Sequence, residues 1–402
     1  MAALCAGTAL HAACTADRSG AESNSAVRDS AGIEIVEHIG PPSDTSQPAA
    51  LEGVLSIGAG ATDTIIQFGR IGDVVRLSNG HVVVAVGSDA RWFDADGRHV
   101  RTGTRNGSGP GEIQGPILSL TRMAGDSVAA TEMRGGQFKH VVLSPSGEFV
   151  RETRVDPEKL GRLGDWGECF VSVLPDLSMV RCEVTPSERE GGPNPGPGLL
   201  RRLRRLVHVS SNLDARHNLG YDIGLEQYGL NVGTSTYFVR HPFHARTHVA
   251  YGGTPMRIAI VTNPPYALEV WTASGVLERI IRRRDGRRPP SSIELDWARE
   301  QLIASERRYN PKMVDRVVTD VPTPDSLPAA VDLLMSSEGD ILLQRFHVDS
   351  TIFDVFDARG AYVRELRFPS GFRPLHIADG YFTGIRVDVD DIPLVEVYQF
   401  RR

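Results

Sequence analysis

The sequence predicts an all-β protein, folded as a six-bladed β-propeller. Three observations predict this fold: an abundance of turn-forming residues, a hairpin pattern that recurs along the chain, and an extra strand pattern near the N-terminus. The 402 residues include 41 Gly and 25 Pro, as expected of many short strands joined by tight turns. Hydrophobic residues make up 41%, enough for a core, and the net charge of −6 argues against general nucleic-acid binding.

The recurring pattern has two apolar strands around an inner turn, then a third strand, a four-residue outer turn and a fourth strand. Inner hairpins such as "VVRLSNGHVVVAV", with its Asn-Gly turn, occur six times. In a degenerate outer turn, "VSSNLDAR" from Val209, Leu213 replaces the glycine, and we expect Asn212 to supply the turn. The regular outer turns are "FDADGRHV" from Phe93, "LSPSGEFV" from Leu143, "WTASGVLE" from Trp271 and "FDARGAYV" from Phe356.

Six inner hairpins but only five outer turns leave one blade without its outer strand. The segment "RDSAGIEIVEH" from Arg28 repeats the outer-turn pattern, with a strand that begins at Ile33. The last strand of the chain, "LVEVYQF" from Leu394, has no outer partner of its own. We therefore expect the N-terminal strand to complete the last blade and close the ring, which leaves no free sheet edge.

One inserted helix is predicted near 291–308. Ser291 and Glu294 have the spacing of a capping box. We expect the helix to pack against the side of the propeller or to cover one mouth of its channel. The apolar residues at helical intervals are Ile293, Leu295, Trp297, Ala298 and Leu302.

The glycine-rich stretch "GSGPGEIQGPILSL" resembles the start of an NHL-type propeller repeat. Over about residues 29–402 the chain resembles a group of uncharacterised bacterial six-bladed β-propeller proteins, TolB-like in architecture. Matching segments are Arg105, Gly107, Gly109–Glu112, and "SLPAAVDLLMSSEGDILLQRF" with "FDVFDARG"; Ser108, Ile113 and Leu343 depart from the pattern. The resemblance implies a fold and no activity. The loop is not a P-loop, because no Lys-Ser/Thr follows its last glycine, so we interpret it as structural.

Residues 1–28 are predicted to be a signal or lipoprotein-like segment followed by a flexible tether, ahead of a propeller over 29–402. Ala12 and Ala13 precede Cys14, the expected lipidation site, which predicts a periplasmic or extracellular protein with a membrane tether. A disordered cytosolic tail stays open, because no Lys or Arg precedes the apolar part. Cys169 and Cys182 flank a hairpin pattern; either a disulfide in an oxidising compartment or two half-buried thiols fits them.

Candidate ligand-binding residues come from loops and basic runs. They are Arg105 and Glu112 of the glycine-rich loop, His241 and His244 of "RHPFHARTH", and Arg201, Arg202, Arg204 and Arg205 of "RRLRR". His244 and His248 would hold zinc only on a helix, and Pro242 argues against one, so polar loop histidines are the simpler interpretation. The arginines, with "RRRDGRR" at 282–288, either meet an anionic partner or protect strand edges.

Acidic pairs are the last candidates. Asp388, Asp390 and Asp391, like Asp94 and Asp96, suggest calcium ligands, but hairpin turns explain them more simply.

The sequence contains no Gly-x-Ser-x-Gly, His-Glu-x-x-His or Cys-x-x-Cys motif. Two functions stay open. The favoured one is a non-enzymatic cell-envelope scaffold that binds a protein, peptide or glycan, acts as a monomer and needs no cofactor. The alternative, by fold analogy, is a metal-dependent hydrolase or lactonase with a divalent ion, such as calcium or zinc, in the channel.

Overall fold

The computed structural model describes residues 25–45, 51–58, 65–135, 137–160, 171–183, 197–201, 203–224, 226–262, 266–284, 286–388 and 390–400. Within these residues the strands form one six-stranded, five four-stranded and one three-stranded sheet. The described helices include none with the length and apolar character to cross a membrane.

The first half of the chain folds into three four-stranded antiparallel meanders, which we name after their innermost strands. The β4 sheet contains β4 (Asp73–Arg76), β5 (Val82–Val86), β6 (Asp89–Phe93) and β7 (His99–Thr102). The β8 sheet contains β8 (Ile117–Arg122), β9 (Val128–Arg134), β10 (Gln137–Leu143) and β11 (Phe149–Arg154). The β12 sheet contains β12 (Val171–Val173), β13 (Met179–Glu183), β15 (Arg204–Val209) and β16 (Arg216–Asp222).

The second half repeats this plan. The β19 sheet contains β19 (Thr247–Gly252), β20 (Arg257–Thr262), β21 (Ala267–Thr272) and β22 (Leu277–Arg283). The β23 sheet contains β23 (Asp332–Met335), β24 (Ile341–Arg345), β25 (Thr351–Phe356) and β26 (Tyr362–Phe368). The β27 sheet contains β27 (Phe372–Ala378), β28 (Tyr381–Val387), β29 (Pro393–Gln399) and β3 (Glu52–Ile57). This arrangement is a β-propeller, as the sequence predicts.

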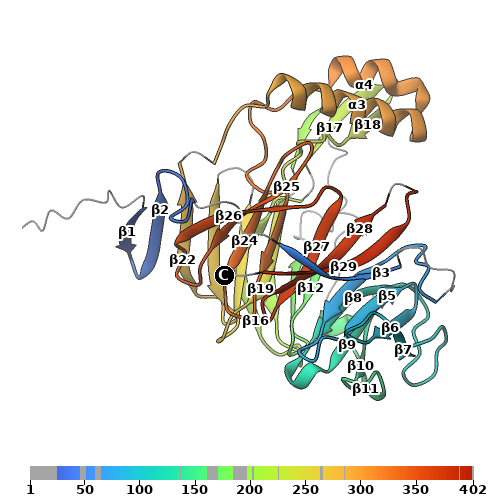
Figure 1. Cartoon of the computed structure of the whole chain (residues 1–402). Helices are drawn as coiled ribbons and strands as arrows, with labels where there is room; N and C mark the ends of the chain where they lie inside the picture. The colour runs from blue at the N-terminus through green and yellow to red at the C-terminus, as the bar shows by residue number, and fades with distance from the viewer. Residues whose placement is uncertain are drawn as a thin grey trace, which may run out of the picture.

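An N-terminal strand does close the last sheet, but the prediction of its residues was wrong. β3 pairs with β29, and Ile57 lies opposite Val395 within a buried apolar cluster. The predicted segment instead forms a hairpin of β1 (Ser25–Ser30) and β2 (Ile33–His38), which extends the β19 sheet by parallel pairing with β22 (Figure 1). The Asp29 carboxylate accepts a hydrogen bond from Gly32 N–H, so the recognised turn closes this local hairpin.

The turns of the repeat form where the pattern places them, with one correction. Leu213, rather than Asn212, takes the left-handed backbone conformation, with φ of 67°, at the place where the other copies have glycine. Asn212 supports the turn by accepting a hydrogen bond from Asp214 N–H. Asp94 and Asp388 accept backbone N–H groups two and four residues further on, so they are turn residues as interpreted.

Inserted segments build a separate layer, which we call the cap. It comprises a three-stranded sheet of β14 (Gly198–Leu200), β17 (Gln227–Val232) and β18 (Ser235–Val239), with helices α3 (Ser292–Tyr309) and α4 (Val314–Asp320) packed on it (Figure 1). The short helices are α1 (Pro157–Leu160), η1 (Ala124–Asp126) and η2 (Pro311–Met313).

The predicted helix α3 has its capping box, in which Ser291 and Glu294 hold each other's backbone N–H groups. The second helix α4 and the small sheet were not predicted. The buried face of α3 carries Leu302, which packs with the inserted sheet, and Ala298, which packs with Phe243 and Leu327. Ile293, on the outer face, is 68% exposed.

Candidate functional site

The innermost strands β4, β8, β12, β19, β23 and β27 all line one cavity of about 540 Å³, which we call the axial cavity. Its wall also includes turns at the far ends of these strands, at Ala124, Pro175 and Asp379. The cap is inserted before β19 and β23, at the near ends of the inner strands. The cavity therefore reaches the face of the propeller opposite to the cap.

Asp73, the first residue of β4, is the main acidic group of the axial cavity. Its two carboxylate oxygens accept hydrogen bonds from Val74 N–H at 2.8 Å and from Leu120 N–H of the next sheet at 2.7 Å. Burial nevertheless raises the pKa of Asp73 to about 6, and these hydrogen bonds limit the rise. The Asp73 carboxyl is therefore mostly ionised at pH 7 and becomes mostly protonated below about pH 6.

Hydroxyl groups lie close to this carboxylate. Burial raises the pKa of Tyr251 to about 12, with the negative charge of Asp73 as the next cause, and the Thr121 side chain hydrogen-bonds the phenol. Thr121 donates to the Val173 carbonyl at 3.1 Å, and Ser119 also lines the cavity. Because a hydroxyl both donates and accepts, this wall can form hydrogen bonds with donor groups and with acceptor groups of a ligand.

The charged groups at the turn end of the cavity are already paired. Arg122 contacts the carboxylates of Asp126 at 2.7 Å and of Asp379 at 2.5 Å. Burial lowers the pKa of His376 to about 4, so its imidazole is neutral at pH 7. The cavity thus presents the Asp73 carboxylate, a neutral imidazole and several hydroxyls, while the Asp379 carboxylate is paired with Arg122. Among the described residues, no group of three or more His, Cys, Asp or Glu side chains is arranged to hold a metal ion.

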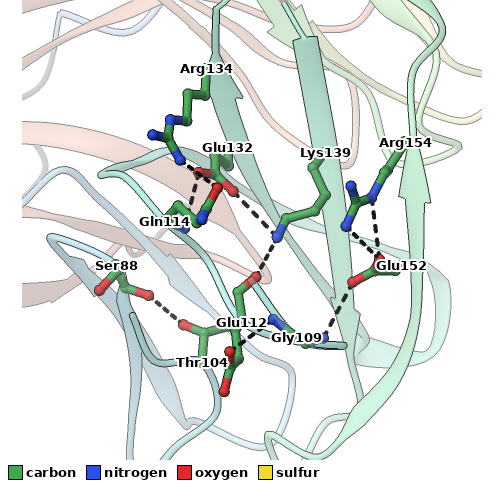
Figure 2. Close-up of polar contacts among 11 residues, drawn as sticks. Ser88, Thr104, Gly109, Glu112, Gln114, Glu132, Arg134, Lys139, Glu152 and Arg154 are labelled. Atoms are coloured by element: carbon green, nitrogen blue, oxygen red, sulfur yellow. Dashed lines mark hydrogen bonds and ion pairs between the residues drawn. The ribbon is translucent and has the colours of Figure 1, made fainter. Parts of the chain in front are cut away.

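The predicted residues of the glycine-rich loop do not line this cavity and lie in the connection from β7 to β8. Figure 2 shows Glu112 of this loop with the polar groups around it. Glu112 folds back on its own loop, accepting Gly109 N–H at 2.8 Å and pairing with Arg105 at 2.7 Å. These contacts hold the pKa of the Glu112 carboxyl below its usual range. Lys139, which pairs with buried Glu132, donates to the Glu112 carbonyl. The contacts agree with the structural interpretation of the loop.

The predicted histidine and arginine residues do not form one site, because they lie in different parts of the structure. His241 and Arg201 line one small cavity in the cap, while His244 donates its Nδ1–H to the His241 carbonyl at 2.9 Å. His248 is buried within β19 rather than in a loop. The other predicted arginines diverge: Arg204 is buried in β15, Arg205 is exposed on the same strand, and Arg202 lies outside the described residues.

The predicted cysteines are only partly described. Cys182 is fully buried on β13 and is disulfide-bonded. Cys169 and Cys14 lie outside the described residues.

Asp73 and Tyr251 were not among the residues predicted from the sequence. The repeat itself carries a signal for the first, because Asp332 stands at the same first position of β23, likewise accepts the next N–H at 2.8 Å, and likewise has a pKa raised by burial. Aligning the inner strands by register would have singled out both aspartates. Tyr251 has no such signal in this single sequence.

No family model matches the chain, and no curated protein matches it. Solved structures resemble it in architecture. A Bacteroides fragilis protein described as exported is 13% identical, with a TM-score of 0.46 over 92% of this chain and 100% of that one. The Cps50 β-propeller domain of Myceliophteria thermophila is 9% identical, with a TM-score of 0.40 over 88% and 100%. A Xanthomonas campestris gluconolactonase is 10% identical, with a TM-score of 0.39 over 89% and 99%. Because the similarity is this low, the β-propeller fold is assigned from the sheets of this chain and not from these structures.

Proposed function

We propose that this protein is a binding protein of the cell envelope whose axial cavity holds a small, uncharged, hydroxyl-rich ligand of the sugar class. The observation that carries the proposal is the convergence of six inner strands on one cavity with a carboxylate and hydroxyls in its wall. A volume of about 540 Å³ is in the range of small-molecule sites.

The charges of the cavity favour an uncharged ligand. Asp73 is mostly ionised at pH 7 and repels anions, while Arg122 is already paired with two carboxylates. A ligand hydroxyl can donate to Asp73 and exchange hydrogen bonds with Tyr251 and the neighbouring hydroxyls. The apolar part of the wall, which includes Val249 and Leu375, suits the carbon face of a sugar ring.

The envelope location rests on two observations. The disulfide at Cys182 is typical of an oxidising compartment, and the small residues before Cys14 are typical of an exported lipoprotein. Metabolic labelling with a palmitate analogue, in wild type and in Cys14→Ser, tests the tether. Label that persists in the variant would contradict lipidation at this residue.

Calorimetric titration with glucose, maltose and N-acetylglucosamine tests the ligand class. We expect binding of at least one sugar by wild type and at least about tenfold weaker binding by Tyr251→Phe, because the phenol loses its donor. Tyr221→Phe is the matched control, since Tyr221 is 59% exposed and lies outside the cavity. Binding to none of the three sugars, or equal binding by Tyr251→Phe, would overturn the proposal.

The pH dependence of sugar binding is a second test. Because the pKa of Asp73 is about 6, the carboxylate loses its charge below that pH and becomes a weaker acceptor. We expect sugar affinity to rise between pH 5 and pH 7 in wild type. The same titration on Asp73→Asn should give a flat profile, and a profile parallel to wild type would remove Asp73 from the site.

A further inference from the structure

A second cavity, of about 280 Å³, lies in the cap and is separate from the axial cavity. It is bounded by β14 and β17, by the turn at 241–245 and by the segment 321–328 that leads towards β23. Three stretches that the sequence analysis singled out independently each place one side chain in its wall: Arg201, His241 and Arg287. We call it the cap cavity.

His241 supplies a hydrogen-bond donor to the cap cavity. Its side chain is buried, with 7% exposure, and its Nδ1 accepts Phe243 N–H at 3.1 Å. Burial lowers the pKa of His241 to about 4, so the imidazole is neutral at pH 7. A neutral imidazole whose Nδ1 accepts a hydrogen bond carries its proton on Nε2. In the described part of the chain, this Nε2–H has no hydrogen-bond partner.

The positive charges of the cavity are unequally engaged. Arg201 is held by Glu226, with Nε 2.6 Å from the carboxylate. Arg287 contacts only the Ser326 hydroxyl, at 3.1 Å, and no carboxylate among the described residues lies within ion-pair distance of it. The same wall therefore contains one guanidinium outside ion-pair distance of the described carboxylates and one imidazole N–H, together with the Asp325 carboxylate. An acceptor with negative charge is the complementary ligand group.

The rest of the wall combines polar side chains, Gln227, Thr323 and Asp325, with a larger set of apolar ones. Phe243 is 2% exposed and stacks on Trp297 at a centroid distance of 6.2 Å, so its ring is fixed. The other apolar or aromatic lining residues are Leu199, Tyr228, Ala245, Val321, Pro322, Pro324, Leu327 and Pro328. Such a wall suits the apolar body of a ligand rather than an inorganic anion.

We propose that the cap cavity binds a small monocarboxylate with an apolar body, whose carboxylate contacts Arg287 and the Nε2–H of His241. The apolar body lies between Phe243 and the proline-rich segment. This site is independent of the axial cavity and of its proposed sugar ligand.

Ligand-observed ¹⁹F NMR with 3-(4-fluorophenyl)propionate, on the full chain, tests this site. We expect line broadening that unlabelled 3-phenylpropionate reverses and that 3-phenylpropanamide, which lacks the charge, does not. Arg287→Gln should weaken binding at least about tenfold, since a charged hydrogen bond is lost. Arg287 is exposed, so this variant is expected to fold, and its unfolding temperature checks that. Arg284→Gln, an exposed neighbour outside the cavity, is the matched control and should bind like wild type.

Each other outcome is decisive. No binding of the acid, equal binding of the amide, or unchanged affinity in Arg287→Gln would overturn the proposal. Loss of acid binding in Tyr251→Phe would place the acid in the axial cavity and also overturn it. Failure of sugar binding leaves this test unaffected, so the two proposals fail separately. A tripeptide with C-terminal phenylalanine distinguishes the source: equal affinity assigns the site to peptide termini, and preference for the free acid assigns it to small metabolites.

Discussion

Asp73 lines the axial cavity and Asp354 lies in the interior of the propeller, and these two carboxylates differ in what surrounds them. Asp354 is fully buried on β25 and is surrounded by side-chain donors from two sheets. The donors are Arg283 at 2.6 Å, Tyr266 at 2.6 Å and Tyr362 at 2.9 Å, and Arg345 adds an ion pair at 3.0 Å. Asp73 has two backbone N–H groups and no arginine at hydrogen-bond distance among the described residues.

This difference separates a structural acid from an available one. The donors around Asp354 engage both of its oxygens and join the β19 sheet to the β23 sheet, and its complete burial leaves no access for a ligand. Asp73 retains acceptor capacity next to a cavity, and its raised pKa shows that its charge is not fully compensated. Burial of a carboxylate is therefore poor evidence of function until its donors have been identified.

Removal of the Asp354 carboxylate should have the largest effect on stability. In Asp354→Ala, Arg283, which is 5% exposed, keeps a buried charge without its nearest counter-ion. We expect the free energy of unfolding to fall by about 3–5 kcal/mol, as for other broken buried ion pairs. Urea denaturation followed by tryptophan fluorescence measures it. Asp390→Asn, in an exposed turn, is the control and should stay within about 0.5 kcal/mol of wild type.

Removal of the Asp73 charge should raise the free energy of unfolding rather than lower it, and the size of the gain should depend on pH. Its folded pKa of about 6 lies above the ordinary value of 3.8, so it favours the folded state below pH 4, and this contribution is lost as the pH rises through 6. Relative to wild type, Asp73→Asn should therefore gain up to about 3 kcal/mol between pH 4 and pH 7.5. Urea denaturation at both pH values gives the difference. A constant offset between the two proteins would contradict the raised pKa.

The sequence predicted the repeated part of this molecule well, because each sheet is specified by local signals. An Asn-Gly turn or an Asp-x-x-Gly turn between alternating apolar residues forms its hairpin wherever the chain goes next. The N-terminal closure was harder, since pairing across the ring is set by packing between residues more than 300 positions apart, such as Ile57 and Val395. Local turn chemistry placed 28–38 correctly in a hairpin but carried no information on its partner strand.

The candidate sites were harder to predict from the sequence for the same reason. Arg201, His241 and Arg287 come from three insertions, and nothing in their local patterns indicates that they line one cavity. The sequence identified Arg201 and His241 as candidates through residue type alone, and Arg287 only as part of the basic run at 282–288. Arg105 and Glu112 attracted the same attention but satisfy each other within their own loop. Residue type suggests chemistry, whereas only the fold determines whether a group is already engaged.

Tyrosine hydroxyls lie close to both carboxylates, and Tyr266→Phe tests the contact with Asp354. The Tyr266 hydroxyl donates to Asp354 Oδ2 at 2.6 Å inside a buried cluster. Its removal should lower the free energy of unfolding by about 2 kcal/mol, the usual cost of a buried hydrogen bond to a charged group. The effect should be smaller in the background of Asp354→Ala, where the acceptor is gone, and a double-mutant cycle measures the coupling. Additive effects would show that the hydroxyl acts independently of Asp354.

Tyr251→Phe is the corresponding change at the axial cavity, and we expect the smallest effect on stability, within about 0.5 kcal/mol. Its hydroxyl faces a cavity that water can enter, so a water molecule can take the place of the lost hydroxyl beside Thr121 and Asp73. Sugar affinity, by contrast, should fall in the same variant. A large loss of stability in Tyr251→Phe would mean that this hydroxyl supports the fold as strongly as that of Tyr266 does. Asp73 and Asp354 would then both be structural acids, and the axial cavity would lose the polar groups on which its ligand depends.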